Sequence, residues 1–559
     1  MSLTKHFRFL VVSLLGMTAA LGAQEPRRFS RADTLRGTNG PARSWWDVSF
    51  YDLHVKVNPK DSSISGWNGI TYRATAHGRR PTGSNREMQI DLQVPLVIDS
   101  VVQDRRKLTF RRDSNAYFVS MPAAAQGAPG TLSVYYHGKP RAAMRAPWDG
   151  GFVWQRDSLG RPFIATANQG LGASVWWPNK DWGGDEPDSQ RVAITMPDSI
   201  MNVSNGRLRS VTREADGSIT WEWFVTNPIN NYGISVNAGR YAPFSQVYQG
   251  EQGPLTLDFY PLAIHLDTAR VQFQQTVPMM ACFEHWFGPY PFYEDGFKLV
   301  ETPHLGMEHQ SAVAYGNWFR NGYRGRDLSA TGRGLKWDFI IVHEAAHEWW
   351  ANNITAKDLA DMWVHESFAN YSEGLYTECQ QGKQAGAEYI IGSRANIRND
   401  RPIIAAFGVN AQGSGDMYYK GGSMLHTIRQ VIADDEKWRG ILRGAQKTFR
   451  HKAIDGIELR NYISREAGID LSKVFEQYLT TTKVPALEYW VGNGNLNYRW
   501  ANVVPGFDMP VEVALPDAPA TFRRIRPTTA WSSLSTTMTA KDTLVIRPDF
   551  YVTGKNVGN

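Results

Sequence analysis

Cysteine is scarce in this sequence. Only Cys282 and Cys379 occur in 559 residues. A chain of this size with two cysteines cannot be held by a disulfide framework and must depend on a large hydrophobic core. The spacing does not decide whether the two cysteines pair, and we expect free, buried thiols.

Three further absences each exclude a class of protein. Beyond the first 23 residues there is no long uncharged apolar run, so we expect no stable insertion into a membrane. Basic and acidic residues nearly balance, at 60 Lys and Arg against 54 Asp and Glu, which argues against a nucleic-acid partner. Low-complexity segments and internal repeats are also absent. With 42% hydrophobic residues and 20 Trp, the composition is typical of packed globular domains.

The N-terminus has the pattern of an export signal. Lys5 and Arg8 precede an apolar run over 9–22, and small residues close the run before Gln24. The pattern predicts a secretory signal peptide over 1–23 and a protein of the periplasm or the extracellular space. A buried helix or a membrane anchor is the alternative. Removal of Lys5 and Arg8 lowers the formal charge from +6 to +4.

The period of the hydrophobic pattern divides the rest of the chain and predicts an α+β multidomain protein. Residues 24–44 are polar and indicate a loose leader. Strict alternation of apolar and polar residues predicts an antiparallel β domain over 45–248. Helical spacing of apolar residues predicts a mainly helical domain over 249–482. Alternation returns in 483–559, which indicates a small C-terminal β module.

The strongest functional signal is the string His-Glu-Ala-Ala-His at 343–347. Two histidines four apart on a helix project from one face, and the glutamate between them can reach a water molecule held there. Glu366 follows His347 after 18 intervening residues. Catalytic zinc sites use three protein ligands and leave the fourth position to water. His343, His347 and Glu366 would be those ligands, and Glu344 would be the base.

In this hypothesis Glu344 takes a proton from the zinc-bound water, whose pKa the metal lowers, and passes it to the leaving amine. The ligand set alone does not separate zinc from manganese or cobalt. Glu373 lies seven residues after Glu366 and shares its face of a second predicted helix. It would orient a ligand histidine from behind, or it would be an ordinary surface carboxylate.

A second segment lies upstream, where Glu308 precedes His343 by 35 residues. Its sequence over 306–310, Gly-Met-Glu-His-Gln, together with the zinc motif and its 18-residue spacing, resembles the aminopeptidase N-type family of zinc metallopeptidases, which carries G-x-M-E-N. The resemblance implies that Glu308 binds the free α-amino group of a peptide, with Gly306 and Met307 beside the substrate. The chain departs from the family pattern by having no residue between glycine and methionine and by having His-Gln where asparagine is usual.

Two more segments extend the resemblance. The string Tyr-Tyr-Lys-Gly at 418–421 is similar to the family's Y-x-K-G, and alignment on Lys-Gly selects Tyr418 as the donor to the oxyanion of the tetrahedral intermediate. The string Asn-Gln-Gly at 168–170 resembles the segment from which a glutamine of the β domain reaches the cleft. Gln169 would then be a second contact to the N-terminal end of the peptide.

The resemblance covers roughly 45–559. It implies a β domain, a thermolysin-like catalytic domain with one zinc ion and a C-terminal β-sandwich, with no room for the large helical C-terminal domain of many relatives. The implied function is a secreted zinc aminopeptidase acting on peptide substrates. Two alternatives remain: a zinc endopeptidase that uses the same site without a limit at the N-terminus, and a non-catalytic scaffold that binds peptides.

Overall fold

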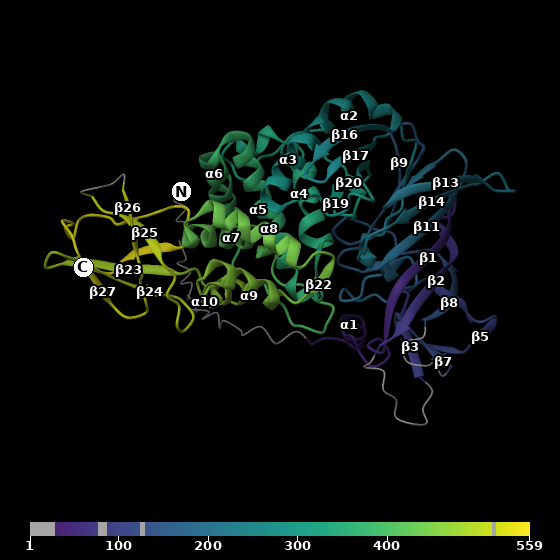
Figure 1. Cartoon of the computed structure of the whole chain (residues 1–559), viewed down its shortest axis with the longest axis horizontal. Coiled ribbons are helices and arrows are strands. Elements are labelled where there is room, and N and C mark those ends of the chain that lie inside the picture. The colour runs from purple at the N-terminus through teal and green to yellow at the C-terminus, as the bar shows by residue number, and fades with distance from the viewer. Residues whose placement is uncertain (1–27, 76–85, 123–128, 517–520, 559) are drawn as a thin grey trace, which may run out of the picture.

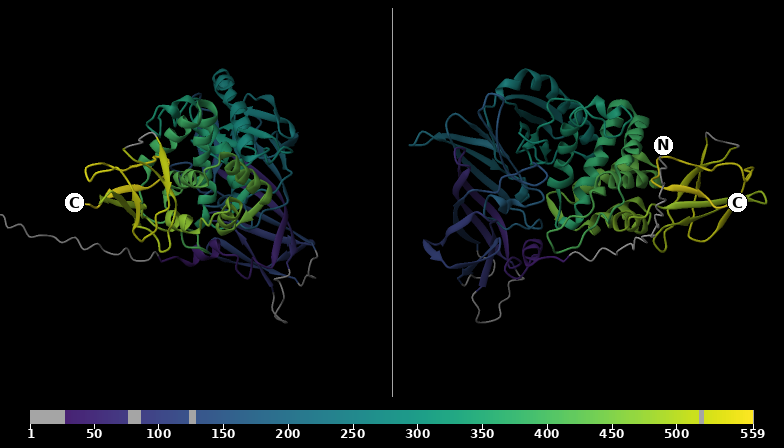
Figure 2. Two further views of the ribbon diagram at one scale, coloured as in Figure 1. Left: turned by 60° about the vertical axis from the view of Figure 1, so that its left-hand side comes forward. Right: turned by 180° about the vertical axis from the view of Figure 1, so that it is seen from behind.

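The computed structural model describes residues 28–75, 86–122, 129–516 and 521–558. A β-rich N-terminal part and a small C-terminal β module lie at opposite ends of a helical middle part (Figures 1 and 2). The signal peptide predicted over 1–23 lies outside the described residues. Within them, no helix combines the length and the apolar character needed to cross a bilayer.

An eight-stranded sheet forms the body of the N-terminal part, in the order β13-β14-β11-β1-β2-β8-β4-β5. The predicted alternation is present in β1, where Tyr51 and Leu53 are buried and Asp52 between them is half-buried. The expectation of a purely antiparallel domain is wrong, because β1 pairs in parallel with β11. The long connection between β2 and β11 allows the chain to return in the same direction. The strands are β1 (Trp46–Asn58), β2 (Ser63–Ala74), β4 (Val97–Gln103), β5 (Arg106–Leu108), β8 (Pro129–Gly138), β11 (Ser189–Met196), β13 (Arg207–Arg213) and β14 (Ile219–Val225).

Two smaller sheets complete this part, in the orders β3-β7-β6 and β12-β15-β10-β9. Strand β10 matters for the site, because Asn168 and Gln169 follow its last residue directly. The strands are β3 (Arg86–Asp91), β6 (Phe110–Asp113), β7 (Ala116–Met121), β9 (Gly151–Arg156), β10 (Pro162–Ala167), β12 (Met201–Val203) and β15 (Asn237–Gly239).

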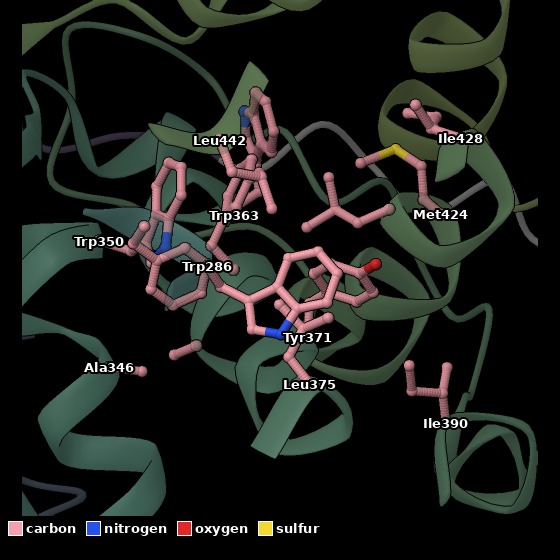
Figure 3. Close-up of a cluster of buried hydrophobic side chains, with 14 of the residues drawn as sticks. Trp286, Ala346, Trp350, Trp363, Tyr371, Leu375, Ile390, Met424, Ile428 and Leu442 are labelled. Atoms are coloured by element: carbon pink, nitrogen blue, oxygen red, sulfur yellow. The ribbon is translucent and has the colours of Figure 1, made fainter. Parts of the chain in front are cut away.

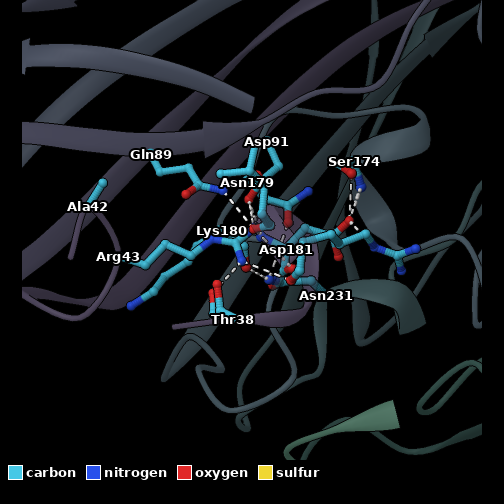
Figure 4. A network of polar contacts seen from close by, with 12 residues as sticks. Thr38, Ala42, Arg43, Gln89, Asp91, Ser174, Asn179, Lys180, Asp181 and Asn231 are labelled. Atoms are coloured by element: carbon cyan, nitrogen blue, oxygen red, sulfur yellow. Dashed lines mark hydrogen bonds and ion pairs between the residues drawn. The ribbon is translucent and has the colours of Figure 1, made fainter. Parts of the chain in front are cut away.

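The described part of the predicted leader, residues 28–44, is not the loose segment that its polar composition indicates. Helix α1 (Arg31–Gly37) forms within it, and Arg43 near its end is fully buried. The Arg43 guanidinium forms an ion pair with Asp91 and donates to the carbonyl oxygen of Thr38 at 2.9 Å (Figure 4). Burial raises the pKa of Asp91, and the adjacent arginine opposes that rise. Composition could not predict this order, because a buried ion depends on partners distant in sequence.

The middle part combines helices with a five-stranded sheet of order β16-β17-β18-β20-β19. This sheet starts at Phe244, ahead of the predicted boundary at residue 249, because β16 continues the alternation of the strands before it. Strand β19 lies at the edge of the sheet. The strands are β16 (Phe244–Gly250), β17 (Gly253–Tyr260), β18 (Phe297–Glu301), β19 (Gly306–Met307) and β20 (Val313–Tyr315), with a separate pair β21 (Ile354–Ala356) and β22 (Lys452–Ile454). The helices are α2 (Leu266–Gln272), α3 (Thr276–Phe287), α4 (Phe339–Ala346), α5 (Trp363–Gln381), α6 (Lys383–Ser393), α7 (Tyr419–Ile432), α8 (Asp435–Thr448), α9 (Gly456–Ala467) and α10 (Ser472–Thr480).

A core rich in aromatic residues holds the helices of the middle part together. Trp350 stacks on Phe368 of α5 with ring centroids 3.9 Å apart, and Trp363 and Tyr371 of the same helix lie in the same cluster (Figure 3). Large aromatic side chains contribute much of the apolar area that such a core buries. The cluster continues into the C-terminal module, where it includes Trp500.

The two cysteines form a disulfide bond, so the expectation of free thiols is wrong. Cys282 lies on α3 and Cys379 near the end of α5, and their Cα atoms are 6.1 Å apart. This distance is within the range that a disulfide spans. The sequence did not predict the pairing because it depends on the packing of two helices that are far apart along the chain.

The C-terminal module consists of two small sheets, in the orders β27-β24-β23-β29 and β26-β25-β28. The alternation predicted after residue 483 places Leu487 and Trp500 inside. Nε2 of His426 in α7 lies 2.9 Å from Oδ1 of Asp549, and this contact joins the module to the helical part. The strands are β23 (Ala486–Gly492), β24 (Asn495–Ala501), β25 (Val511–Ala514), β26 (Phe522–Ile525), β27 (Ser532–Ser535), β28 (Val545–Ile546) and β29 (Thr553–Asn556).

The disulfide bond gives a prediction for stability. Replacement of both cysteines, Cys282→Ala with Cys379→Ala, removes a cross-link between positions 97 residues apart and should lower the free energy of unfolding by about 2–5 kcal/mol. Urea unfolding followed by tryptophan fluorescence measures the change. A reductant should destabilise the wild-type protein but not the double variant. If the wild-type protein and the double variant unfolded at the same urea concentration, and a reductant changed neither midpoint, the disulfide bond would be contradicted.

Candidate active site

Helix α4 carries the two histidines, and its sequence explains where it begins. Asp338 is the N-cap residue, and its Oδ1 accepts hydrogen bonds from the backbone of Ile340 at 3.0 Å and of Ile341 at 3.4 Å. After the helix the chain makes a wider, π-type turn over 348–352. This turn brings the carbonyl oxygen of Trp350 to within 3.1 Å of Nδ1 of the second histidine, and the two atoms form a hydrogen bond.

The three predicted ligands meet between α4 and α5. Nε2 of His343 and Nε2 of His347 lie 3.6 Å and 3.4 Å from Oε2 of Glu366. All three side chains are buried, and one ligand atom from each lies within 4.8 Å of the other two. Glu366 Oε2 has no hydrogen-bond partner although it is buried. A zinc ion fits this arrangement, because it would satisfy the unpaired oxygen and prefers these donor types.

Glu373 forms a hydrogen bond with the ring nitrogen of His343 that does not face the metal position. Its Oε1 lies 2.8 Å from Nδ1 of His343, and its other oxygen accepts from the hydroxyl of Tyr389 at 2.6 Å. The alternative of a surface carboxylate is wrong, because the Glu373 side chain is 0% exposed. With Nδ1 bound in this way, Nε2 of His343 is directed at the metal position.

Glu344 lies on α4 directly after His343, and its side chain lines the cleft. The carboxylates of Glu344 and Glu308 lie close to the His347 imidazole. One potential metal-binding atom from each of the three residues lies within 4.8 Å of the other two. Burial raises the pKa of Glu344 to about 7, and the neighbouring Glu308 adds to the rise. A carboxylate with a pKa near neutrality is suited to accept a proton and return it.

Strand β19 is close to this helix because of a glycine. A Cβ added at Gly306 would lie 2.9 Å from Oε1 of Glu344 and from the Ile340 side chain, so a larger residue would push the strand away from α4. Glu308 follows the strand directly and is buried. Its backbone carbonyl oxygen accepts a hydrogen bond from Asn352 at 2.9 Å, which fixes the strand to the turn after α4.

Glu308 is the centre of a polar cluster that crosses from one domain to the other. Its Oε1 accepts from Nε2 of Gln169 at 2.5 Å and from the hydroxyl of Tyr232 at 3.1 Å. Gln169 also donates to Oε1 of Glu366 at 3.1 Å. Burial raises the pKa of Glu308. The sequence did not reveal Tyr232, since one tyrosine among 23 carries no local motif.

Tyr418 comes from a third element, directly before α7. Its ring centroid lies 6.0 Å from that of His343. Gly421 allows α7 to approach α5 closely, because a Cβ there would lie 1.9 Å from the hydroxyl of Ser367. Burial, followed by the nearby Glu366, raises the pKa of Tyr418 well above its usual value, which keeps the phenol protonated as a donor.

All ten residues that the sequence indicated line one cavity of about 430 Å³. They are His343, Glu344, His347, Glu366, Glu373, Gln169, Gly306, Met307, Glu308 and Tyr418. His309 and Gln310, where the chain departs from the family pattern, are buried and do not line it. The lining also includes residues that no motif indicated, among them Trp148, Tyr323, Arg326, Phe339 and Tyr419.

The ligand geometry predicts which variants lose metal. His347→Ala removes one of three ligands and should abolish stoichiometric zinc, whereas Glu344→Gln leaves the ligand set intact and should keep it. Glu373→Gln should weaken zinc binding by about 10- to 100-fold, because it loosens the support of His343. Metal analysis after dialysis against a chelator of graded strength measures all three. Full zinc retention by His347→Ala would contradict the assigned ligands.

Comparisons with known proteins agree with this geometry. Residues 272–478 match the model of the peptidase family M1 domain. Aminopeptidase N of Lactococcus lactis is 25% identical over 228 residues, which are 35% of this chain and 26% of that protein. Aminopeptidase N of Streptomyces lividans is 24% identical over 327 residues, or 54% of this chain and 36% of that protein. The chain thus spans about a quarter to just over a third of the length of these relatives.

A solved structure shares the fold over a larger span. The M1 zinc metallopeptidase from Deinococcus radiodurans superimposes with a TM-score of 0.67 at 20% identity, covering 80% of this chain and 96% of that one. Another solved structure with a TM-score of 0.67 is described as a two-domain M1 zinc metallopeptidase, and the shared fold supports the N-terminal β domain and the helical domain found here. The matched domain over 272–478, the similar aminopeptidase N sequences and the shared fold together support an aminopeptidase N-type family of M1 peptidases for this chain.

Proposed function

We propose that this protein is a zinc aminopeptidase that hydrolyses the N-terminal bond of peptides. One observation carries the proposal: Glu308, Gln169 and Tyr232 place a buried carboxylate with two polar partners next to the metal ligands. An ammonium group that leaves water needs such a carboxylate. A fixed carboxylate beside the reacting centre therefore favours peptides that present a free α-amino group there.

The arrangement of cavities supports cleavage at the end of a peptide. A second, smaller cavity of about 80 Å³ lies beyond the amine-binding cluster. Gln169 is the one described residue that lines both this cavity and the cleft. Because its amide is bonded to both Glu308 and Glu366, Gln169 separates the two spaces. A peptide with further residues on the N-terminal side of the cleaved residue would have to displace these bonds.

The roles of the side chains follow from their positions. Bound zinc supplies Lewis acidity, which acidifies a water molecule and polarises the scissile carbonyl. Glu344 accepts the proton of the attacking water and delivers it to the leaving amine. Tyr418 donates a hydrogen bond to the oxygen on which negative charge develops. A solved structure of the Deinococcus radiodurans protein is described as bound to a Tyr-Ser-Ala substrate, which supports a peptide as the substrate here.

Export is part of the proposal. The N-terminal pattern over 1–23 supports a signal peptide, and the bond between Cys282 and Cys379 supports an oxidising compartment such as the periplasm or the extracellular space. We also propose that the two sheets over 486–556 form a β-sandwich. N-terminal sequencing of the protein recovered from its native compartment tests the export signal.

The proposed specificity predicts a difference between free and blocked peptides. The wild-type protein should cleave a peptide with a free α-amino group and leave its N-acetylated form intact, because acetylation removes the charge that Glu308 binds. Glu308→Ala should reduce kcat/KM on the free peptide by about 100-fold or more, since a charged contact is lost in a buried site. Rates from liquid chromatography measure both effects. Equal cleavage of the blocked peptide would favour the endopeptidase alternative.

The assignment of Tyr418 can be tested against its neighbour. Tyr418→Phe removes the proposed oxyanion donor and should lower kcat by about 10²–10³ with little change in KM or zinc content. Tyr419→Phe is a matched control, because this tyrosine also lines the cleft but is not the residue aligned with the family motif. Steady-state kinetics on one aminoacyl fluorogenic substrate compare the two. A similar fall in kcat for both variants would contradict the assignment.

A further inference from the structure

Charge is distributed unevenly along the cleft. Four buried or partly buried carboxylates line it, those of Glu308, Glu344, Glu366 and Glu373. Arg326 is the one lysine or arginine among the described lining residues. Its side chain is exposed, and within the described parts of the chain its guanidinium makes no ion pair or hydrogen bond. An arginine without a carboxylate partner in an acidic cleft is available to a ligand.

A series of aromatic contacts joins Arg326 to the first histidine. The Phe339 ring stacks on His343 with centroids 5.1 Å apart, and Tyr323 packs edge-on against Phe339 at 5.3 Å. The Arg326 guanidinium lies 5.6 Å from the centroid of the Tyr323 ring. Arg326 thus lines the cleft on the Tyr323 and Phe339 side of His343, whereas the Glu308 carboxylate groups with Glu344 and His347.

A rigid turn presents Arg326 to the cleft. The backbones of Tyr323 and Arg326 exchange hydrogen bonds of 2.8 Å and 3.1 Å, and the two residues between them have φ values of 50° and 85°. Positive φ at both central positions is the geometry of a type I′ turn, which Gly325 accommodates. The turn is also tied to α4, because Asn317 accepts from the backbone of Arg324 at 2.8 Å and donates to Asp338, the N-cap residue, at 2.8 Å.

We propose that Arg326 binds a carboxylate on the part of the peptide that leaves, so that the site favours short or acidic peptides. This inference rests on the proposed function, since Glu308 must first fix the amino end. A guanidinium offers two parallel donors that match a carboxylate. With the carboxylate of Glu308 and the cation of Arg326 both lining one cleft, the site is complementary to a peptide that carries an amino charge and a carboxylate. The carboxylate is the C-terminus of a short peptide or an acidic side chain next to the cleaved bond.

Two pairs of peptides test the inference and separate the two sources. Ala-Ala-Ala with a free C-terminus is compared with its C-terminal amide, and the amide of Ala-Glu-Ala is compared with the amide of Ala-Gln-Ala. In the wild-type protein we expect kcat/KM to be about 10- to 100-fold higher for the carboxylate member of at least one pair. The pair that shows the difference identifies the source of the carboxylate.

Variants of the turn show whether Arg326 is responsible. In Arg326→Gln the ratio within the discriminating pair should fall close to one. Arg324→Gln is the matched control, because Arg324 stacks on Trp318 and does not line the cleft, so this variant should keep the wild-type ratio. Equal rates within both pairs for the wild-type protein, or a ratio that Arg326→Gln retains, would overturn the inference.

Failure of the inference is distinguishable from failure of the proposed function. Ala-p-nitroanilide carries no carboxylate and reports N-terminal cleavage alone. Hydrolysis of the anilide and of the amides without discrimination would overturn only the role of Arg326. No hydrolysis of the anilide or of any peptide would overturn the aminopeptidase proposal and the inference with it.

Discussion

The close packing of α4 on α5 is the constraint on which the site depends. The two helices bring two histidines and three carboxylates together with their side chains buried, and such groups are stable there only when each polar atom has a partner. The stack of Trp350 on Phe368 and the aromatic core around it hold the helices at this distance. One oxygen of Glu366 still lacks a partner. The packing energy of the core therefore maintains a site that binding of a cation completes.

The N-terminal domain contributes side chains to the candidate site in the helical domain. Gln169 extends from the end of β10, and Tyr232 lies in a short turn stabilised by the side chain of Asn230. Asn230 also donates to Asn352 at 2.9 Å, and Asn352 holds the backbone of Glu308. The same polar contacts that join the domains thus position the carboxylate that we propose binds the amino group. Relative movement of the domains would alter specificity before it altered the zinc ligands, which all lie in one domain.

Local spacing predicted that His343 and His347 would lie together, because helix geometry alone places them on one face. The rest of the site required relations between distant segments. Tyr232 and Arg326 have no motif: Tyr232 reaches Glu308 from a short turn of the β domain, and Arg326 lines the cleft from a turn fixed to α4. The disulfide, the parallel pairing of β1 with β11 and the burial of Arg43 escaped prediction for the same reason. Periodicity reports which face of an element is buried, but not which element covers it.

The carboxylates of the cleft also bear on the direction in which the proposed peptide substrate would bind. Glu344, Glu366 and Glu308 raise the energy of one another's charged forms when no cation is present, as the raised pKa values of Glu344 and Glu308 indicate. A metal ion and a substrate ammonium each relieve part of this repulsion. A substrate carboxylate at the same end would increase it, whereas near Arg326 it gains a partner. The charges that retain the metal therefore also favour the orientation in which the amino end of a peptide lies beside Glu308.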